Sequence, residues 1–226
     1  MKPLAWLLDL LFPPKCPFCG RVLDRAGICG RCEAALPWTG EGETVRVLAG
    51  GLRCAAPLRY EGSVREGLLR FKFQGRSGAA EPLGELLAGC AAEAFSGEFD
   101  LVAWVPVSRR RLRERGYDQA ELLARSACRL WDTKPVRLLE KRRHNAAQSG
   151  LEGAERRREN VRDVYRALPE ARGRRILLVD DICTTGATLC ACARALEGAG
   201  AEAVLCCCVA HAMPKKTEKV HSSSAE

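Results

Sequence analysis

One segment of the sequence combines acidic, hydroxyl and glycine residues in a pattern that suits a sugar phosphate. Residues 176–188 read ILLVDDICTTGAT. The carboxylates of Asp180 and Asp181 can accept hydrogen bonds from vicinal sugar hydroxyls, because ionised carboxylates are acceptors only. A turn of threonine and glycine can direct backbone amides at one phosphate, and the N-terminus of a following helix favours negative charge. The segment predicts a phosphate-binding strand, loop and helix, with an ordinary N-capping turn as the alternative.

Four cysteines near the N-terminus have the spacing of a metal site. They form two Cys-x-x-Cys pairs with nine residues between them, namely Cys16, Cys19, Cys29 and Cys32. Four thiolates complete the tetrahedral coordination of zinc and leave no open position, so we expect a structural role in folding or docking. A redox pair is the alternative, but a redox pair does not need a second pair nearby.

The segments around these residues predict an α/β domain with a parallel sheet. Apolar runs predict buried strands over residues 101–105, 176–179 and 203–210. Helical spacing predicts helices over residues 119–130 and 186–196. The order of strand, helix and strand at the C-terminal end requires a right-handed crossover. The carboxyl ends of the strands then bring the acidic pair and the turn before Arg109 to one edge of the sheet.

The chain divides into three parts by composition. We assign residues 1–40 to an N-terminal helix and the zinc-binding four-cysteine module, 50–212 to the α/β domain and 213–226 to a disordered tail. Residues 37–51, rich in glycine and threonine, are interpreted as a linker. The apolar start is interpreted as a short amphipathic helix, since no small-residue cleavage site follows it as in a signal peptide.

The composition excludes a disordered chain and a membrane-spanning one. The 226 residues are 47% hydrophobic and 28% charged, and no run of about 18 apolar residues occurs. The 13 cysteines without a secretion signal predict a reducing cytoplasm with metal-bound and buried free thiols. The net charge of +8 is concentrated in residues 101–175, which hold 20 Lys/Arg against 10 Asp/Glu. This asymmetry favours a polyanionic ligand, with a solvated arginine surface as the alternative.

The segment 176–188 resembles the phosphoribosyl-diphosphate motif of the type I phosphoribosyltransferases. That resemblance implies that Asp180 and Asp181 bind the ribose hydroxyls and that Mg²⁺ accompanies the phosphoribosyl diphosphate. It also implies that the 5′-phosphate is bound by Thr184, Thr185, Gly186, Ala187 and Thr188. Arg109, in the turn after the strand at 101–105, is expected to contact the diphosphate. The implied fold is a type I phosphoribosyltransferase-like parallel-sheet domain preceded by a small four-cysteine zinc module.

Together with the cysteine module, these features are similar to the ComF family of competence-associated proteins. Further matching stretches are YEG at 60–62, FKF at 71–73, RLRERGYDQA at 111–120, and Gln148 with Arg158, Asn160 and Val161. Two residues depart from the family pattern: Ser108 stands where histidine is frequent, and Asp118 stands where asparagine is common. Residues 141–165 resemble the mobile hood of phosphoribosyltransferases, which orders over a ligand.

Two functions follow from this resemblance. The first is phosphoribosyl transfer, a pentosyl transfer serving DNA uptake in natural transformation. The second is a non-catalytic scaffold of the competence machinery that binds a ligand, single-stranded DNA or a helicase-like competence protein. Arg109, Arg110, Arg111, Arg113 and Arg115 exceed the charge that one diphosphate needs, so some of them face solvent or nucleic acid. The low aromatic content of 6% argues against a dedicated base-stacking platform.

Overall fold

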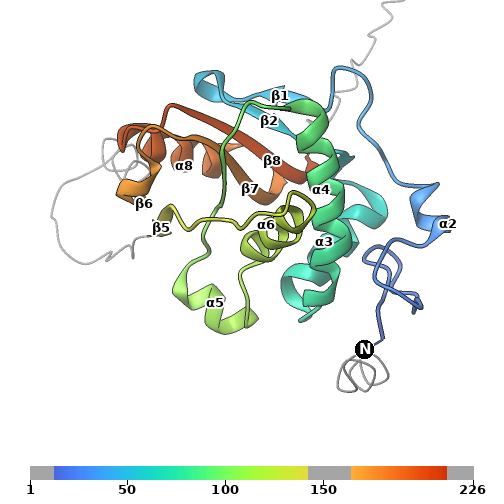
Figure 1. Cartoon of the computed structure of the whole chain (residues 1–226). Helices are drawn as coiled ribbons and strands as arrows, with labels where there is room; N and C mark the ends of the chain where they lie inside the picture. Colours follow the sequence, from blue (N-terminus) through green and yellow to red (C-terminus); the bar gives the residue numbers. More distant parts are fainter. Residues whose placement is uncertain (1–12, 142–163, 213–226) are drawn as a thin grey trace, which may run out of the picture.

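A six-stranded, mostly parallel sheet forms the centre of the protein in a computed structural model that describes residues 13–141 and 164–212 (Figure 1). Its strands run in the order β1-β2-β8-β7-β4, and β3 pairs with the end of β8. Their bounds are β1 Val45–Val47, β2 Arg53–Ala55, β3 Leu58–Arg59, β4 Leu101–Trp104, β7 Arg175–Cys183 and β8 Ala203–His211. Only β1 with β2 is antiparallel within this sheet, so the predicted parallel α/β fold is confirmed.

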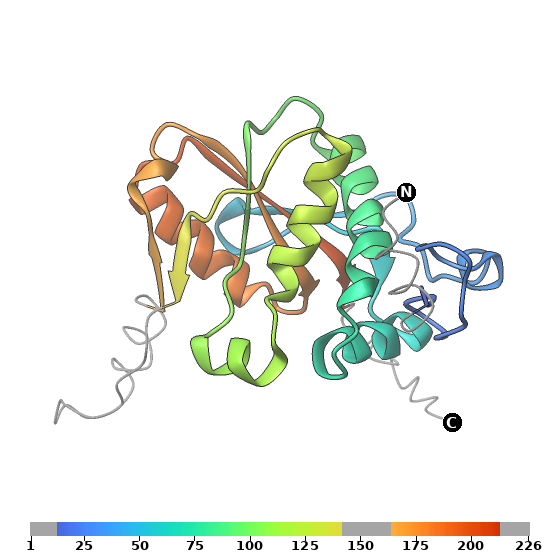
Figure 2. The same ribbon diagram turned by 60° about the horizontal axis from the view of Figure 1, so that its bottom comes forward.

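Helices cover both faces of the sheet (Figures 1 and 2). The helices are α3 Gly62–Phe73, α4 Ala80–Ala94, α6 Gln119–Leu130 and α8 Ala187–Gly198. Side chains of α3, α4 and α6 form one buried cluster with Val179, whereas α8 forms a second cluster with Leu178. Neighbouring residues of β7 thus face different layers, as the alternation of side chains along a strand requires.

Shorter elements complete the described fold. A two-stranded antiparallel sheet, with strands β5 Leu139–Lys141 and β6 Tyr165–Ala167, lies beside α8. The remaining helices and 3₁₀ turns are α2 Gly30–Glu33, α5 Arg109–Arg115, η1 Ala49–Gly51, η2 Ser77–Ala79 and η3 Pro169–Ala171. In the part of the chain that the structure describes, no helix has the length and apolar character to cross a membrane.

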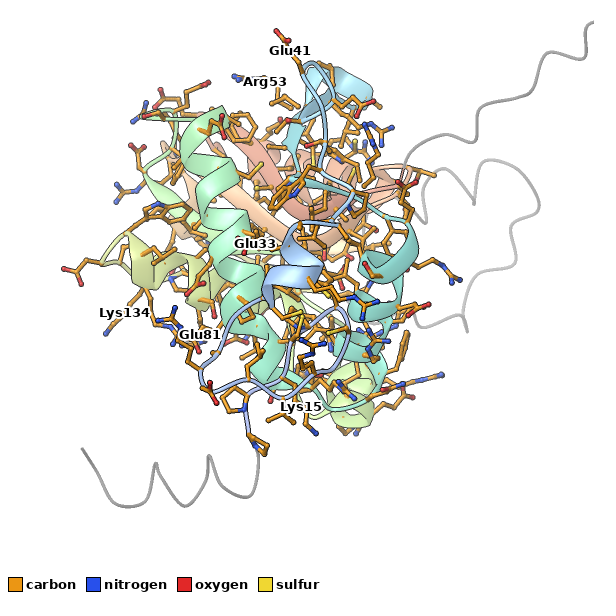
Figure 3. The ribbon with its side chains drawn as sticks, turned by 90° about the vertical axis from the view of Figure 1, so that its right-hand side faces the viewer. Lys15, Glu33, Glu41, Arg53, Glu81 and Lys134 are labelled. Carbon is orange, nitrogen blue, oxygen red and sulfur yellow. The ribbon has the colours of Figure 1, made fainter. Side chains whose placement is uncertain are left out.

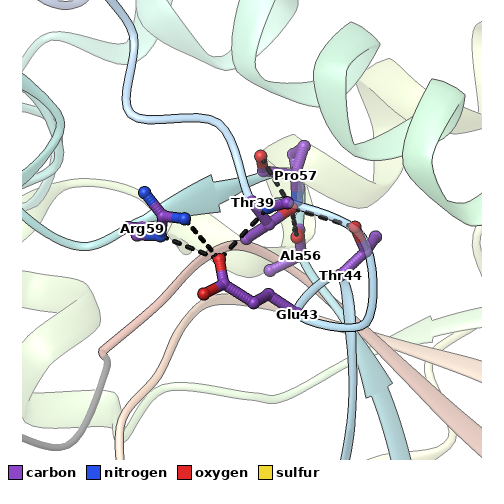
Figure 4. Close-up of polar contacts among 7 residues, drawn as sticks. Thr39, Glu43, Thr44, Ala56, Pro57 and Arg59 are labelled. Atoms are coloured by element: carbon purple, nitrogen blue, oxygen red, sulfur yellow. Dashed lines mark hydrogen bonds and ion pairs between the residues drawn. The ribbon is translucent and has the colours of Figure 1, made fainter.

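The segment predicted as a linker is instead tied to the sheet (Figure 4). Residues 45–47 form β1, and the hydroxyl of Thr39 lies 3.1 Å from that of Thr44 and 3.0 Å from the carbonyl oxygen of Ala56. Glu43 accepts hydrogen bonds from Arg59, with the shorter one at 2.5 Å. The local composition suggested a flexible connection, but pairing with β2 satisfies the backbone groups that a free linker would expose to water.

Strand β7 is longer than the apolar run that predicted it. Its pairing with β8 continues past Val179 to Cys183, which lies opposite His211. The hydrophobic pattern ends at Asp180 because the carboxyl end of the strand carries polar side chains, while the backbone hydrogen bonds go on. Asp180 and Asp181 therefore lie within β7 and not after it.

Helices α4 and α6 cross closely at Gly84, side by side in Figures 1 and 2. A Cβ atom on Gly84 would lie 2.4 Å from the Cβ atom of Ser126 and 3.0 Å from the carbonyl oxygen of Leu123. These neighbours are backbone or short side chains, so they cannot move aside without shifting a helix. The layer over β7 and β8 thus depends on a residue without a side chain at this point.

We therefore expect Gly84→Ala to destabilise the fold by about 1–3 kcal/mol, the usual effect of overpacking a core. Gly89→Ala is the matched control, because it lies in the same helix with no atom within 4 Å of the added Cβ. The control is expected to be neutral or to stabilise by up to about 1 kcal/mol through helix propensity. Urea unfolding measures the free energy of unfolding of each variant. Equal values for the two variants would contradict the close crossing of α4 and α6.

Candidate functional site

The loop between β7 and α8 has the geometry of an anion site. Gly186 precedes the first residue of α8 with φ of 75°, a conformation that L side chains rarely adopt. A Cβ atom there would also lie 2.7 Å from the Cδ1 atom of Leu48. Both the backbone conformation and the lack of space therefore require glycine at this position. Four of the predicted loop residues are exposed around it: Thr184, Thr185, Ala187 and Thr188. The structure thus places an open hydroxyl-rich turn at the N-terminus of a 12-residue helix.

The acidic pair precedes this loop, and its two members have different surroundings. The Asp181 carboxylate is only 8% exposed and forms an ion pair with Lys72 of α3 at 2.9 Å. The Asp180 carboxylate accepts a hydrogen bond from the backbone N–H of Asp181 at 2.9 Å. The charge of the Asp181 carboxylate is therefore compensated by Lys72, whereas the Asp180 carboxylate is stabilised by a backbone N–H group.

Burial raises the pKa of Asp180 to about 8, and the neighbouring Asp181 carboxylate contributes in the same direction. The Lys72 ammonium opposes this shift, whereas Asp118 adds to it. Lys141 of β5 also lies within electrostatic reach of Asp180, and its own pKa is lowered mainly by burial. A carboxyl that resists ionisation in the free protein gains from any ligand that supplies hydroxyl donors or positive charge.

The turn after β4 lies at the same edge of the sheet, because β4 and β7 are parallel neighbours. Asp118 accepts hydrogen bonds from the backbone N–H groups of Val107 at 3.0 Å and Glu121 at 3.3 Å. Ser108 caps α5 by accepting a hydrogen bond from the N–H of Arg111 at 3.3 Å. Both departures from the family pattern thus act as N-caps, which holds the turn in place whatever ligand it contacts.

Helix α5 exposes several arginines of the positively charged segment 101–175 to solvent. Arg109, Arg111 and Arg113 are exposed and form no ion pair with any other residue in the described ranges. Arg110 instead pairs with Glu114 at 2.8 Å, and Arg115 lies 4.9 Å over the ring of Phe73. The structure therefore gives Arg109, the predicted diphosphate ligand, an open position at the start of α5.

A pocket of about 350 Å³ is lined in part by Lys72, the ion-pair partner of Asp181. Its lining is mainly cationic and consists of Lys72, Phe73, Gly75, Arg111, Glu114 and Arg115. Another pocket, of about 750 Å³, lies between the cysteine module and α4 and includes Glu33, Glu41, Glu85 and Glu93. Figure 3 shows Glu33 and Glu41 on that side of the molecule. The charges make the first pocket, and not the second, suitable for a phosphorylated ligand.

The four cysteines of the N-terminal module converge, as their spacing predicted. The sulfur atoms of Cys16, Cys19, Cys29 and Cys32 all lie within 4.8 Å of one another. Burial opposes ionisation of the Cys16 thiol, but backbone N–H groups directed at its sulfur lower its pKa to about 7. Four convergent thiols with backbone donors fit a structural zinc ion, which the cluster would hold with no position open for a substrate.

The module is docked on α3, in the view of Figure 3. A Cβ atom on Gly67 would lie 2.7 Å from the carbonyl oxygen of Pro17 and 3.1 Å from the ring of Phe18. Arg70 of α3 donates a hydrogen bond to the carbonyl oxygen of Phe18, whose side chain is buried. Lys72 lies in the last turn of the same helix, so the cysteine module and Asp181 both contact α3.

Several features of the site were not identified from the sequence. Lys72 belongs to a stretch that matched the family, but nothing in its spacing indicated an ion pair with Asp181. Leu48 lies under Gly186, in the segment interpreted as a linker. Both contacts join residues far apart in the chain, so no local pattern reports them. Residues 142–163, which include most of the predicted hood with Gln148, Arg158, Asn160 and Val161, lie outside the described residues.

Comparison with known proteins defines the class of protein to which this chain belongs. A phosphoribosyl transferase domain matches residues 113–224, and a double zinc ribbon domain matches residues 7–44. The fold is similar to that of a glutamine phosphoribosylpyrophosphate amidotransferase from B. subtilis, with a TM-score of 0.44 and 21% identity over 61% of this chain and 30% of that one. The sequence matches describe a phosphoribosyltransferase domain preceded by a zinc ribbon.

Two curated relatives narrow the class to a family. The chain is 30% identical over 182 residues to "Competence protein ComFC" of Bacillus subtilis (strain 168), covering 80% of this chain and 70% of the relative. It is also 30% identical over 205 residues to "DNA utilization protein YhgH" of Escherichia coli (strain K12), covering 85% and 83%. The chain belongs to the ComF family, as the cysteine module and the motif at 176–188 had indicated.

The raised pKa of Asp180 predicts a pH-dependent stability that Asp180→Asn removes. The folded protein keeps the proton on Asp180 up to a pH of about 8, whereas the unfolded chain releases it near the ordinary value of 3.8. This contribution to stability is complete below the unfolded pKa and is lost as the pH rises through the folded pKa. The free energy of unfolding of the variant minus that of the wild type should therefore increase with pH, by up to about 1.4 kcal/mol per unit.

Urea unfolding at a series of pH values between about 4 and 8 measures this difference. Taking the difference removes the titrations of groups that do not interact with Asp180, so the remaining slope reports Asp180 together with its coupling to Asp118 and Lys141. A difference that stays constant across the range would show that Asp180 ionises normally.

Proposed function

We propose that this protein binds phosphoribosyl diphosphate with Mg²⁺ at the carboxyl edge of β7 and transfers its phosphoribosyl group, in the service of DNA uptake. The observation that carries the proposal is one continuous unit: an acidic pair at the end of a central parallel strand, followed by a turn with a required glycine and a helix N-terminus. Membership of a family with a phosphoribosyltransferase domain supports the same ligand.

The loop residues would bind the 5′-phosphate. Exposed Thr184, Thr185 and Thr188 supply hydroxyl donors, and the amides at the start of α8 point out of the helix. Gly186 holds the loop in this turn, because its positive φ and its close approach to Leu48 leave no room for a side chain. Fixed donors at this position hold the ribose ring in one orientation, which is the main service a transferase gives to a reaction at C1.

The acidic pair would bind the ribose 2′ and 3′ hydroxyls. Asp180 offers a carboxylate that forms no ion pair within residues 13–141 and 164–212, and Asp181 retains one oxygen beyond its contact with Lys72. Oxygen ligands of this kind also suit Mg²⁺, which supplies charge neutralisation to the diphosphate leaving group. Hydroxyl donors stabilise the ionised form of Asp180, so binding is expected to lower its pKa.

The cations beside the pair would receive the diphosphate. Lys72 and Arg111 line one pocket, and Arg109 begins the adjacent helix. As the bond from C1 to the diphosphate breaks, negative charge grows on the leaving oxygen and positive charge on the ribose. Preorganised cations on one side and carboxylates on the other stabilise both changes. The zinc module has no part in this chemistry and would support α3, which carries Lys72.

The test of binding is the double variant Asp180→Asn/Asp181→Asn. Losing two hydrogen bonds to charged acceptors is expected to cost about 2–5 kcal/mol, a rise in Kd for phosphoribosyl diphosphate of about 30-fold or more. Calorimetry with Mg²⁺ measures it, and Glu197→Gln, an exposed residue of α8, is the control. Inorganic diphosphate is the matched ligand, since it lacks the ribose and its affinity should fall by less than that of phosphoribosyl diphosphate.

Unchanged affinity of the double variant for phosphoribosyl diphosphate would contradict the role of the acidic pair. Turnover is a separate question, answered by screening amines and bases for release of diphosphate. Binding that is strong, depends on the acidic pair and releases no diphosphate with any acceptor would favour the scaffold function.

A second candidate function, contact with single-stranded DNA, is favoured by α5 and its neighbour Phe73. The helix exposes Arg109, Arg111 and Arg113 without internal ion pairs in the described ranges. Phe73 is 66% exposed and offers a flat ring beside them. Arginines and an accessible aromatic ring are the combination that binds nucleic acid strands without reading their sequence.

We expect Arg110→Ser/Arg113→Ser to weaken single-strand binding and to leave phosphoribosyl diphosphate affinity unchanged, because neither residue lines the pocket beside Lys72. Each lost phosphate contact should reduce the slope of log affinity against log salt by about 0.7. Fluorescence anisotropy with a labelled oligonucleotide measures the slope, with Arg65→Ser/Arg194→Ser as a control for charge alone. A wild-type protein without measurable affinity at low salt would show that the arginines are merely solvated.

A further inference from the structure

A second group of metal-ligand residues lies in the sheet, directly below the phosphate loop. It consists of Cys54 at β2, Cys183 at the end of β7 and His211 at the end of β8. Their ligand atoms all lie within 4.8 Å of one another, and the three residues are at most 1% exposed. Cys183 and His211 are register partners on adjacent parallel strands, so the sheet itself holds two of the three side chains together.

The hydrogen bonding of His211 leaves one ring nitrogen available. Its Nε2 atom lies 3.2 Å from the carbonyl oxygen of Thr44. A carbonyl oxygen can only accept, so Nε2 carries the hydrogen and the neutral ring has its lone pair on Nδ1. That Nδ1 atom is buried and has no hydrogen-bond partner in the described part of the chain. The nearby Cys183 thiol interacts with the His211 ring but is only a weak donor, so the lone pair on Nδ1 stays available to a group that accepts electrons.

Hydrogen bonds hold Thr44, the partner of His211, in position. Thr44 is held by the hydroxyl of Thr39, which also lies within hydrogen-bond distance of the carbonyl oxygens of Ala56 and Pro57 (Figure 4). A backbone carbonyl that fixes the histidine tautomer is the usual outer partner of a metal-bound imidazole. The segment 39–44 therefore orients the ring as a ligand.

We propose that Cys54, Cys183 and His211 bind one thiophilic divalent cation, with zinc as the ion their chemistry favours. Thiolate and imidazole ligands at bonds of about 2.0–2.3 Å stand about 3.5–3.8 Å apart around tetrahedral zinc, so the present cluster needs only a small contraction. Binding releases the two thiol protons to solvent, and two thiolates with one neutral imidazole balance the charge of the ion. A neutral site suits this dry interior, because an uncompensated charge would be costly there.

The position of the site gives it a consequence for the phosphate loop. Cys183 directly precedes Thr184, so a bound ion would join the start of the loop to β2 and β8 through metal bonds. Cys208 lies near the site as well, with its sulfur atom 4.0 Å from that of Cys54. The metal site does not rest on the proposed function, since it is defined by its own ligands and is separate from the N-terminal four-cysteine cluster.

The test counts metal ions in the full-length protein after saturation with zinc under reducing conditions and desalting. The ratio of zinc to protein, measured by elemental mass spectrometry, is expected to be two zinc ions per chain. Cys183→Ala and His211→Gln should each lower the content to one, and Cys32→Ser should remove the other ion. Cys206→Ala is the matched control, because it removes a buried cysteine of β8 that is outside the cluster, and it should retain two.

A second measurement on the wild type avoids the risk that a core variant does not fold. Cadmium-113 NMR distinguishes an ion bound by four sulfur atoms from one bound by sulfur and nitrogen, so two resonances of different type are expected. One resonance of the four-sulfur type in saturated, folded protein would overturn the proposal. So would a second ion that survives Cys183→Ala/His211→Gln, or a disulfide between Cys54 and Cys183 in protein purified with reductant.

Discussion

The buried ion pair between Lys72 and Asp181 joins the parts of this protein to one another. Asp181 faces the layer formed by α3, α4 and α6, where a carboxylate without a cation would be strongly unfavourable. Lys72, in the last turn of α3, forms this ion pair. The pair therefore holds the C-terminal end of α3 against β7. The cysteine module packs on the same helix at Gly67, so α3 connects the module to the ion pair.

The carboxyl edge of the sheet concentrates groups that the rest of the fold would not tolerate. Strand β7 carries two adjacent carboxylates, Asp181 buried and Asp180 partly exposed, and the chain then turns at a glycine with positive φ. Such unfavourable features persist only where the surroundings enforce them, and they are typical of ligand sites. Here the enforcing contacts come from Lys72, from the N-cap Asp118 and from Leu48 under the loop.

The many buried cysteines have two roles that depend on position. Seven buried cysteines of α4, α6, α8 and β8 fill the core as small apolar side chains, and no disulfide forms among the cysteines of the described residues. Two clusters differ, because in each the sulfur atoms converge with other ligand atoms. The first, in the N-terminal module, is the family's zinc ribbon. The second lies within the sheet and would link metal binding to the geometry of the phosphate loop.

The sequence by itself determined the features that follow from local pattern. The two cysteine pairs, the apolar runs of three strands and the motif at 176–188 each lie within a few residues, so spacing alone predicted the zinc module, the parallel sheet and the loop. Tertiary structure decided what depends on distant residues. The partner of Asp181, the support of Gly186 by Leu48 and the meeting of Cys54, Cys183 and His211 come from separate strands and helices. Only the packing of the sheet and its helices brings these residues into contact or close proximity, and no periodicity along the chain records it.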